Sequence, residues 1–85
     1  MKATEAAARA VEQLAMLSGR VAEAVTGLEK TDDGWRVRVE VLELERIPHS
    51  TDVLAEYAVD LDEEGDLTSY RRVRRYTRGS SKEED

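Results

Sequence analysis

Alternation of apolar and polar residues between Gly34 and Arg78 constrains the fold more than any other feature of the chain. Trp35, Val37 and Val39 fall on one side of an extended backbone, and the charged residues between them fall on the other. This two-residue period is typical of β-strands that have one buried face. The segment as a whole predicts three strands, at about 35–46, 53–62 and 67–78.

Turn signals separate these strands. After Val41 the apolar positions shift by one, to Leu42 and Leu44, which indicates a β-bulge or a strand that leaves the sheet with both faces partly covered. Pro48 ends the first strand. The acidic sequence DEEGD predicts a hairpin between the last two strands. The turn sequence TDDG, directly before the first of these strands, favours an additional short strand at about 25–30.

The N-terminal segment at about 3–18 has the composition and periodicity of an α-helix. Thr4 is a candidate N-cap, and Gly19 is a natural stop. Apolar residues recur at three- and four-residue intervals in one stripe, formed by Ala7, Ala10, Val11, Leu14 and Leu17. The stripe predicts packing on a sheet; a partner helix or a membrane surface is the alternative. We therefore expect an α+β fold, with one N-terminal helix packed on a curved antiparallel meander of three to four strands.

The length of the chain limits its core. We expect 85 residues to form one domain, spanning 1–78, followed by a disordered polar tail at 79–85. A domain of this size buries only about 60 to 65% of the surface that its unfolded chain exposes. A partner or a homodimer interface would therefore stabilise it.

Cysteine is absent, which excludes disulfides, thiolate metal sites and cysteine nucleophiles. Nothing at the N-terminus resembles a signal peptide, and no run approaches the roughly 18 to 20 apolar residues that a membrane span requires. We expect a soluble, cytoplasmic protein without membrane insertion.

The formal net charge of −6 is divided unevenly along the chain. Residues 1–30 sum to 0, residues 31–69 to −9 and residues 70–85 to +3. This division argues against nucleic acid as a partner, because binding of phosphates by bulk attraction needs a net basic footprint. Any contact with a polyanion must use the basic C-terminal segment alone.

Catalytic and metal-binding patterns are not evident. The single histidine, His49, lies beside Ser50 and Asp52, but a catalytic triad depends on geometry and not on neighbouring positions, and we interpret the segment as a turn. The acidic turn at 60–66 lacks the spacing of a calcium loop, and we interpret it as a solvated hairpin tip. We expect no enzyme activity, no cofactor and no metal.

The basic last strand is the strongest candidate for function. It carries the candidate partner-binding residues Tyr70, Arg71, Arg72, Arg74, Arg75, Tyr76 and Arg78. Arginine binds carboxylates or phosphates bidentately, and tyrosine can stack on bases or pack on a protein. The alternative is that these arginines pair across strands with Glu56, Asp60 or the glutamates at 40–45. The sequence leaves both interpretations open.

Three segments in a fixed order resemble the gas vesicle protein GvpO family: GWRVRVEVLELERIP, TDVLAEYAVDLDEEGDL and SYRRVRRYTR. The resemblance covers roughly residues 34–78. The matching positions are Gly34, Trp35, Glu40, Glu43, Arg46, Ile47, Pro48, Asp52, Leu54, Tyr57, Gly65, Tyr70, Arg72, Arg75, Tyr76 and Arg78. One departure is Ala58, where the family pattern has an acidic residue.

The resemblance implies a non-enzymatic accessory protein of gas vesicle formation, which acts through protein-protein contacts. Its expected partners are other gas vesicle accessory or shell proteins, and it would be cytoplasmic or associated with gas vesicles. The composition does not fit a protein of the gas vesicle shell itself, because 38% of the residues of this chain are charged. The alternative function is a regulatory RNA- or DNA-binding module that uses the Tyr/Arg-rich last strand.

Overall fold

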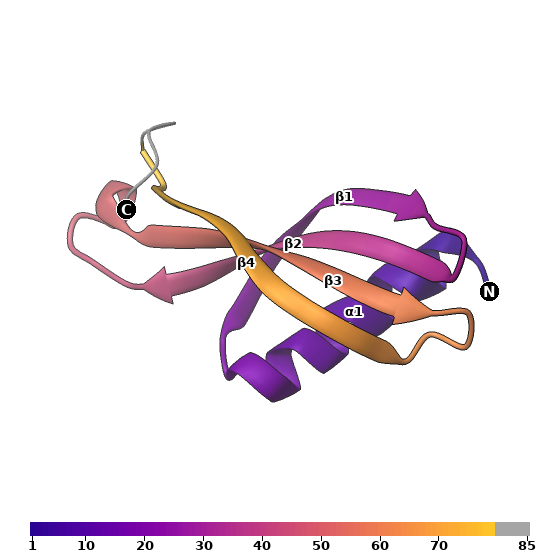
Figure 1. Cartoon of the computed structure of the whole chain (residues 1–85). Coiled ribbons are helices and arrows are strands. Elements are labelled where there is room, and N and C mark those ends of the chain that lie inside the picture. The colour runs from indigo at the N-terminus through magenta and orange to yellow at the C-terminus, as the bar shows by residue number, and fades with distance from the viewer. Residues whose placement is uncertain (80–85) are drawn as a thin grey trace.

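The computed structural model describes residues 1–79 and confirms an α+β fold with one helix followed by a four-stranded antiparallel sheet (Figure 1). The strand order is the order of the chain, β1-β2-β3-β4, as in a meander. The elements are α1 (Ala3–Ser18), β1 (Val21–Lys30), β2 (Gly34–Leu44), β3 (Val53–Asp62) and β4 (Leu67–Thr77).

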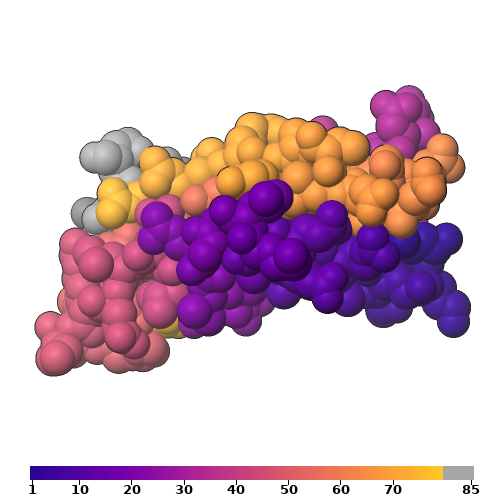
Figure 2. All heavy atoms as spheres, turned by 90° about the horizontal axis from the view of Figure 1, so that it is seen from below, coloured from indigo at the N-terminus to yellow at the C-terminus, as the bar shows by residue number. Residues whose placement is uncertain are grey.

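Helix α1 lies across one face of the twisted sheet (Figures 1 and 2). Ala6, Ala10 and Leu14, at four-residue spacing, are fully buried against it. On the sheet side the core consists of Val37, Val39, Val41, Ala55, Val59 and Leu61. The stripe expected from the sequence is therefore rotated: Ala6 belongs to it, whereas Leu17 is 58% exposed. Small alanines at the contact let the helix backbone approach the strands closely.

The sequence predicted the C-terminal end of α1 but not its N-cap. The helix begins after Lys2, so Thr4 is not the N-cap as predicted, and the Glu5 carboxylate accepts a hydrogen bond from the Lys2 backbone N–H at 3.1 Å. At the other end Gly19 has φ of 70° and donates its N–H to the carbonyl of Ala15, as expected for a glycine stop. At the start of the helix, the Glu5 side chain reaches the backbone N–H of Lys2 because it is three residues beyond this N-cap.

Strand β1 is longer than predicted, since it begins at Val21 and not near residue 25. Two bulges, between Ala22 and Ala24 and between Val25 and Gly27, break its two-residue period, which explains why the sequence pattern was ambiguous. The bulge predicted after Val41 is confirmed, with a register shift in β2.

Beyond the strands, the first residue of the predicted tail is hydrogen-bonded to a loop. The backbone N–H of Gly79 donates to the carbonyl of Ser50 at 2.7 Å, so the loop after β2 holds the end of β4. The rest of that tail, residues 80–85, lies outside the described residues.

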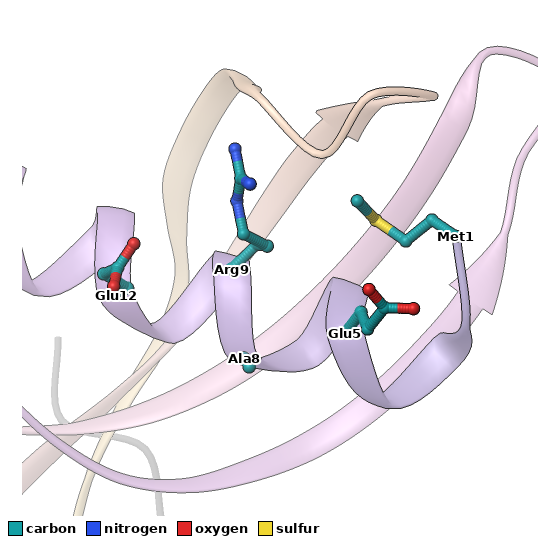
Figure 3. A pocket seen from close by; sticks show the side chains of 5 residues that line it. All are labelled: Met1, Glu5, Ala8, Arg9 and Glu12. Atoms are coloured by element: carbon teal, nitrogen blue, oxygen red, sulfur yellow. The ribbon is translucent and has the colours of Figure 1, made fainter.

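The hairpin between β3 and β4 contacts the start of α1. Arg9 pairs with Asp66 at 3.0 Å, and the amide of Gln13 donates to the Gly65 carbonyl and accepts from the Leu67 N–H. Figure 3 shows the side chains of Met1, which precedes the helix, and Arg9, which lies on it, pointing toward this hairpin. These polar contacts fix the helix along the sheet.

Candidate functional site

The last strand distributes its arginines over both faces of the sheet. In the register with β3, Glu56 lies opposite Arg74 and Tyr57 opposite Arg72, so Val73 is an extra residue in a bulge. Because of this bulge, Arg72 and Arg75 lie on the helix side, while Arg71 and Arg74 lie on the other side. We call that other side the helix-free face; its charged residues are Glu29, Arg36, Arg38, Glu40, Glu56, Asp60, Arg71 and Arg74.

Carboxylates shared between arginines are the main feature of this region. Three carboxylates each lie within 4 Å of two arginines: Asp60 with Arg36 and Arg71, Glu56 with Arg38 and Arg74, and Glu43 with Arg72 and Arg75. Side-chain exposure is 6 to 23% for the carboxylates and 33 to 58% for the arginines. Anions therefore lie beneath a layer of cations, and the six arginines exceed their shared partners by three charges.

The tightest of these contacts is made by Asp60. Arg36 donates from Nε to Oδ1 at 2.8 Å, and the hydroxyl of Ser69 donates to Oδ2 at 3.0 Å. Burial alone would raise the pKa of Asp60, but the hydrogen bonds from Arg36 and Ser69 outweigh it, and the pKa is lowered. The same hydrogen bond raises the pKa of Arg36. This carboxylate is therefore held in its charged form.

Ala58 lies at the centre of the helix-free face, between two arginines. Its neighbour across β2 is Arg38 and its neighbour across β4 is Arg71. Ala58 is fully buried although no helix covers this side of the described chain. Gly27 leaves room for the stem of Arg38, because a Cβ there would approach that side chain to 3.4 Å. The long arginine stems provide the cover.

The two tyrosines of β4 differ in exposure. Tyr76 is 8% exposed, its hydroxyl donates to Glu40, and Arg74 lies 4.5 Å from the centroid of its ring. Burial, together with the hydrogen bond to Glu40, raises the pKa of Tyr76 above its ordinary value. Tyr70 is 39% exposed, with its ring centroid 6.0 Å from that of Tyr57. Tyr76 therefore supports the fold, while Tyr70 remains accessible.

The last arginine binds a different part of the molecule. Arg78 pairs with Glu23 at 2.8 Å and with Asp52 at 3.2 Å. Asp52 is fully buried, and its pKa is lowered chiefly because it accepts the backbone N–H of Arg46. His49 is 73% exposed in its side chain and lies 2.9 Å from Asp52. The contacts around Asp52 brace the loop, in agreement with its interpretation as a turn.

On the helix side, Glu43 joins the remaining two arginines of the strand. Arg75 Nε lies 3.1 Å from Glu43 Oε1 as an ion pair that lacks the alignment of a hydrogen bond, and Arg72 lies at 3.3 Å. The hydroxyl of Tyr57 is 3.5 Å from the same carboxylate, which is a weak contact. Every arginine predicted as partner-binding thus has an intramolecular carboxylate partner and still exposes part of its side chain.

Sequence reasoning missed two members of the layer, Arg36 and Arg38. Both lie on β2 and share the face of Arg71 and Arg74. Their common parity in the sequence was the available signal, but the bulges in β4 concealed which of its arginines would join them.

Two shallow hollows lie beside α1. The first, of about 210 Å³, is lined by Met1, Glu5, Ala8, Arg9 and Glu12 (Figure 3). The second, of about 230 Å³, is lined by Gln13, Met16, Leu17 and Leu67. Within residues 1–79, no group of three or more His, Asp or Glu side chains is placed to hold a metal ion. In the same part of the chain, no helix is long and apolar enough to cross a membrane.

Comparison with known proteins gives consistent similarities. The model of the family described as gas vesicle synthesis protein GvpO matches residues 1–82. A gas vesicle protein O of a Streptomyces species is 56% identical over 72 residues, which are 85% of this chain and 56% of that protein. Gas vesicle protein O1 of Halobacterium salinarum is 42% identical over 62 residues, 73% of this chain and 52% of that protein. This chain therefore spans about half the length of these relatives. No solved structure matches it.

Proposed function

Since this chain belongs to the family of gas vesicle synthesis protein GvpO, we propose that it takes part in gas vesicle formation as a non-enzymatic accessory protein that binds other proteins. Its partners would be other gas vesicle accessory or shell proteins. Family membership supports the role in gas vesicle formation, and the arginine layer supports binding as the way in which the role is performed.

The observation that carries this proposal is the shared pairing of the arginines. A guanidinium has five N–H donors in a fixed fork, and one ion pair to a shared carboxylate leaves most of them free. Arg71, Arg72 and Arg74 keep 58, 50 and 43% of their side chains exposed. Arginine is enriched in protein interfaces, where such exposed forks meet acidic or backbone acceptors.

The same geometry disfavours the alternative of an RNA- or DNA-binding module. That function would need Tyr70 and Tyr76 as stacking platforms, but Tyr76 is 8% exposed. The carboxylates of Glu56 and Asp60 lie directly beneath the arginines and oppose a run of phosphates.

A pull-down with matched charge variants tests the proposal. The variant Arg71→Gln, Arg72→Gln, Arg74→Gln removes three charges from the layer and is expected to lower capture of the other gas vesicle proteins by about tenfold or more. The control Lys2→Gln, Lys30→Gln, Arg46→Gln changes the net charge equally at other exposed sites and should preserve capture. Equal capture by both variants, each folded by circular dichroism, would contradict the assignment.

Two further expectations belong to this proposal and await measurement. A homodimer would add to the small core, and sedimentation analysis would detect it. We also propose that the protein acts in the cytoplasm and associates with gas vesicles, which fractionation of cells that form vesicles would test.

A further inference from the structure

Arg38 and Arg71 are the least satisfied cations of the helix-free face. Arg38 lies 3.6 Å from Glu56, and Arg71 lies 3.9 Å from Asp60, whereas Arg36 reaches the same Asp60 at 2.8 Å. Within residues 1–79, neither Arg38 nor Arg71 donates a hydrogen bond from its guanidinium. Their side chains are 48 and 58% exposed. We infer that this pair, on either side of Ala58, binds a carboxylate side chain of an acidic segment in a protein partner, which rests on the function proposed above.

The register of the sheet places the two arginines at a suitable separation. Ala58 pairs with both, so their strands are two strand spacings apart, about 10 Å at the backbone. In the structure the guanidinium of Arg38 lies near Glu56 and that of Arg71 near Asp60, and both side chains are long enough to turn toward each other above the methyl group of Ala58 when a ligand binds. A carboxylate between them would accept charge-assisted hydrogen bonds from both forks.

The local charge balance favours one added anion at this point. Asp60 and Glu56 are the carboxylates shared by Arg36, Arg38, Arg71 and Arg74, and together with Glu29 and Glu40 the eight charged side chains of the helix-free face sum to a net charge of zero. Ala58, which separates the two carboxylates on β3, contributes none. The row of the sheet that contains Arg38, Ala58 and Arg71 therefore has two positive charges and no carboxylate on β3.

A protein carboxylate fits this surface better than a nucleic acid does. Glu29, at 3.9 Å from Arg36, and Glu40, bound to Tyr76, flank the arginines on the β1 and β2 side. A continuous row of phosphates along a nucleic acid backbone would meet these anions. In an acidic peptide each carboxylate is on its own flexible side chain, so one of them can enter between the two arginines while the others point away from these anions.

The substitution Ala58→Glu provides a direct test, because it supplies an internal carboxylate between Arg38 and Arg71. The probe is a fluorescein-labelled decaglutamate peptide, and binding is measured by fluorescence anisotropy at low salt. Ala58→Glu is expected to weaken binding by about tenfold or more, as is Arg38→Gln combined with Arg71→Gln. The control Ala8→Glu adds the same charge on the exposed side of α1 and should bind as the unaltered protein does.

Ala58 is buried, so folding needs its own control. Ala58→Gln has the size of Ala58→Glu without its charge, so it should weaken binding less than Ala58→Glu does. Equal binding by Ala58→Glu and Ala8→Glu would overturn the inference, as would equal weakening by Ala58→Gln and Ala58→Glu. Tighter binding of a ten-nucleotide single strand than of decaglutamate would overturn the partner class.

The two proposals fail in different ways. If the pull-down depends on Arg71, Arg72 and Arg74 but decaglutamate does not depend on Arg38 and Arg71, the accessory function stands and the carboxylate site is wrong. If decaglutamate binding responds as expected while the pull-down does not, the site stands and the choice of gas vesicle partners is wrong.

Discussion

The two faces of the sheet are both buried at their centres, but a helix covers one and charged side chains cover the other. On one face, α1 excludes water from Val37, Val39 and Val41, which are at most 1% exposed. On the other face, Ala58 is 0% exposed without a helix above it, because arginines of the neighbouring strands lie over it. One cover is apolar and complete, whereas the other is charged and half-exposed.

This difference separates stability from binding. Apolar burial stabilises by about 25 cal/mol for each Å² removed from water, and it leaves nothing for a partner to contact. Exposed ion pairs typically contribute only about 0 to 1 kcal/mol each, and their free donors stay available. The helix side should therefore carry most of the folding free energy, and the helix-free face should carry recognition.

The largest expected effect is the loss of a core side chain on the helix side. Leu14→Ala should lower the free energy of unfolding by about 2 to 5 kcal/mol, because Leu14 is fully buried and its removal leaves a cavity. Urea denaturation followed by circular dichroism measures this. Leu17→Ala, at a position 58% exposed, is the matched control and should change little. Equal losses at the two positions would mean that α1 does not pack as described.

The two faces of the sheet differ in how well the sequence predicted them. The period-two pattern gave β2 and β3 because Val37, Val39 and Val41 need one buried face. The same reasoning could not assign Leu17, since its place at the edge of the helix stripe depends on where the sheet ends. The distribution of the arginines was equally hidden, because it follows from the position of a bulge at Val73, which no local propensity indicates.

Acid should produce the next largest effect, and it should act through carboxylates. The pKa values of Asp60 and Asp52 are lowered in the folded protein, so their contribution to stability is present above about pH 4, the range of an unfolded aspartate. It is lost as the pH falls through the lowered values. When the pH is lowered below about 4, the midpoint temperature of thermal unfolding should therefore decrease.

The variant Asp60→Asn isolates the contribution of the helix-free face to this titration. It should be less stable than the unaltered protein at neutral pH, and its unfolding midpoint should depend less steeply on pH in the acid range. Leu14→Ala should keep the original dependence, because it changes no titratable group. If the unfolding midpoint of Asp60→Asn depends on pH as steeply as that of the unaltered protein, folding does not stabilise the charged form of Asp60.

A smaller effect is expected for Glu56→Gln. The side chain is 9% exposed and lies within 4 Å of Arg38 and Arg74, and its Oε2 accepts a 2.6 Å hydrogen bond from Thr26. Gln keeps the size but removes the charge, so we expect a loss of about 1 to 2 kcal/mol. The arginines are themselves half-exposed and can be hydrated, which limits the loss. A loss as large as that of Leu14→Ala would show that the charged cover is as important to folding as the helix.

The smallest effect on stability should come from Arg71→Gln, and it is the sharpest test of the comparison. Arg71 and Arg36 share Asp60, but Arg36 makes a 2.8 Å hydrogen bond, whereas Arg71 stays 3.9 Å away with 58% of its side chain exposed. Arg71→Gln should therefore cost less than about 1 kcal/mol in urea denaturation, and less than Arg36→Gln. Binding should respond in the opposite order, since the side chain of Arg71 is 58% exposed and donates no hydrogen bond to Asp60, whereas that of Arg36 is 38% exposed and is held by one. If Arg71→Gln destabilises the fold more than Arg36→Gln does, the arginine on β4 is part of the structural cover and the helix-free face loses its claim to be the binding surface.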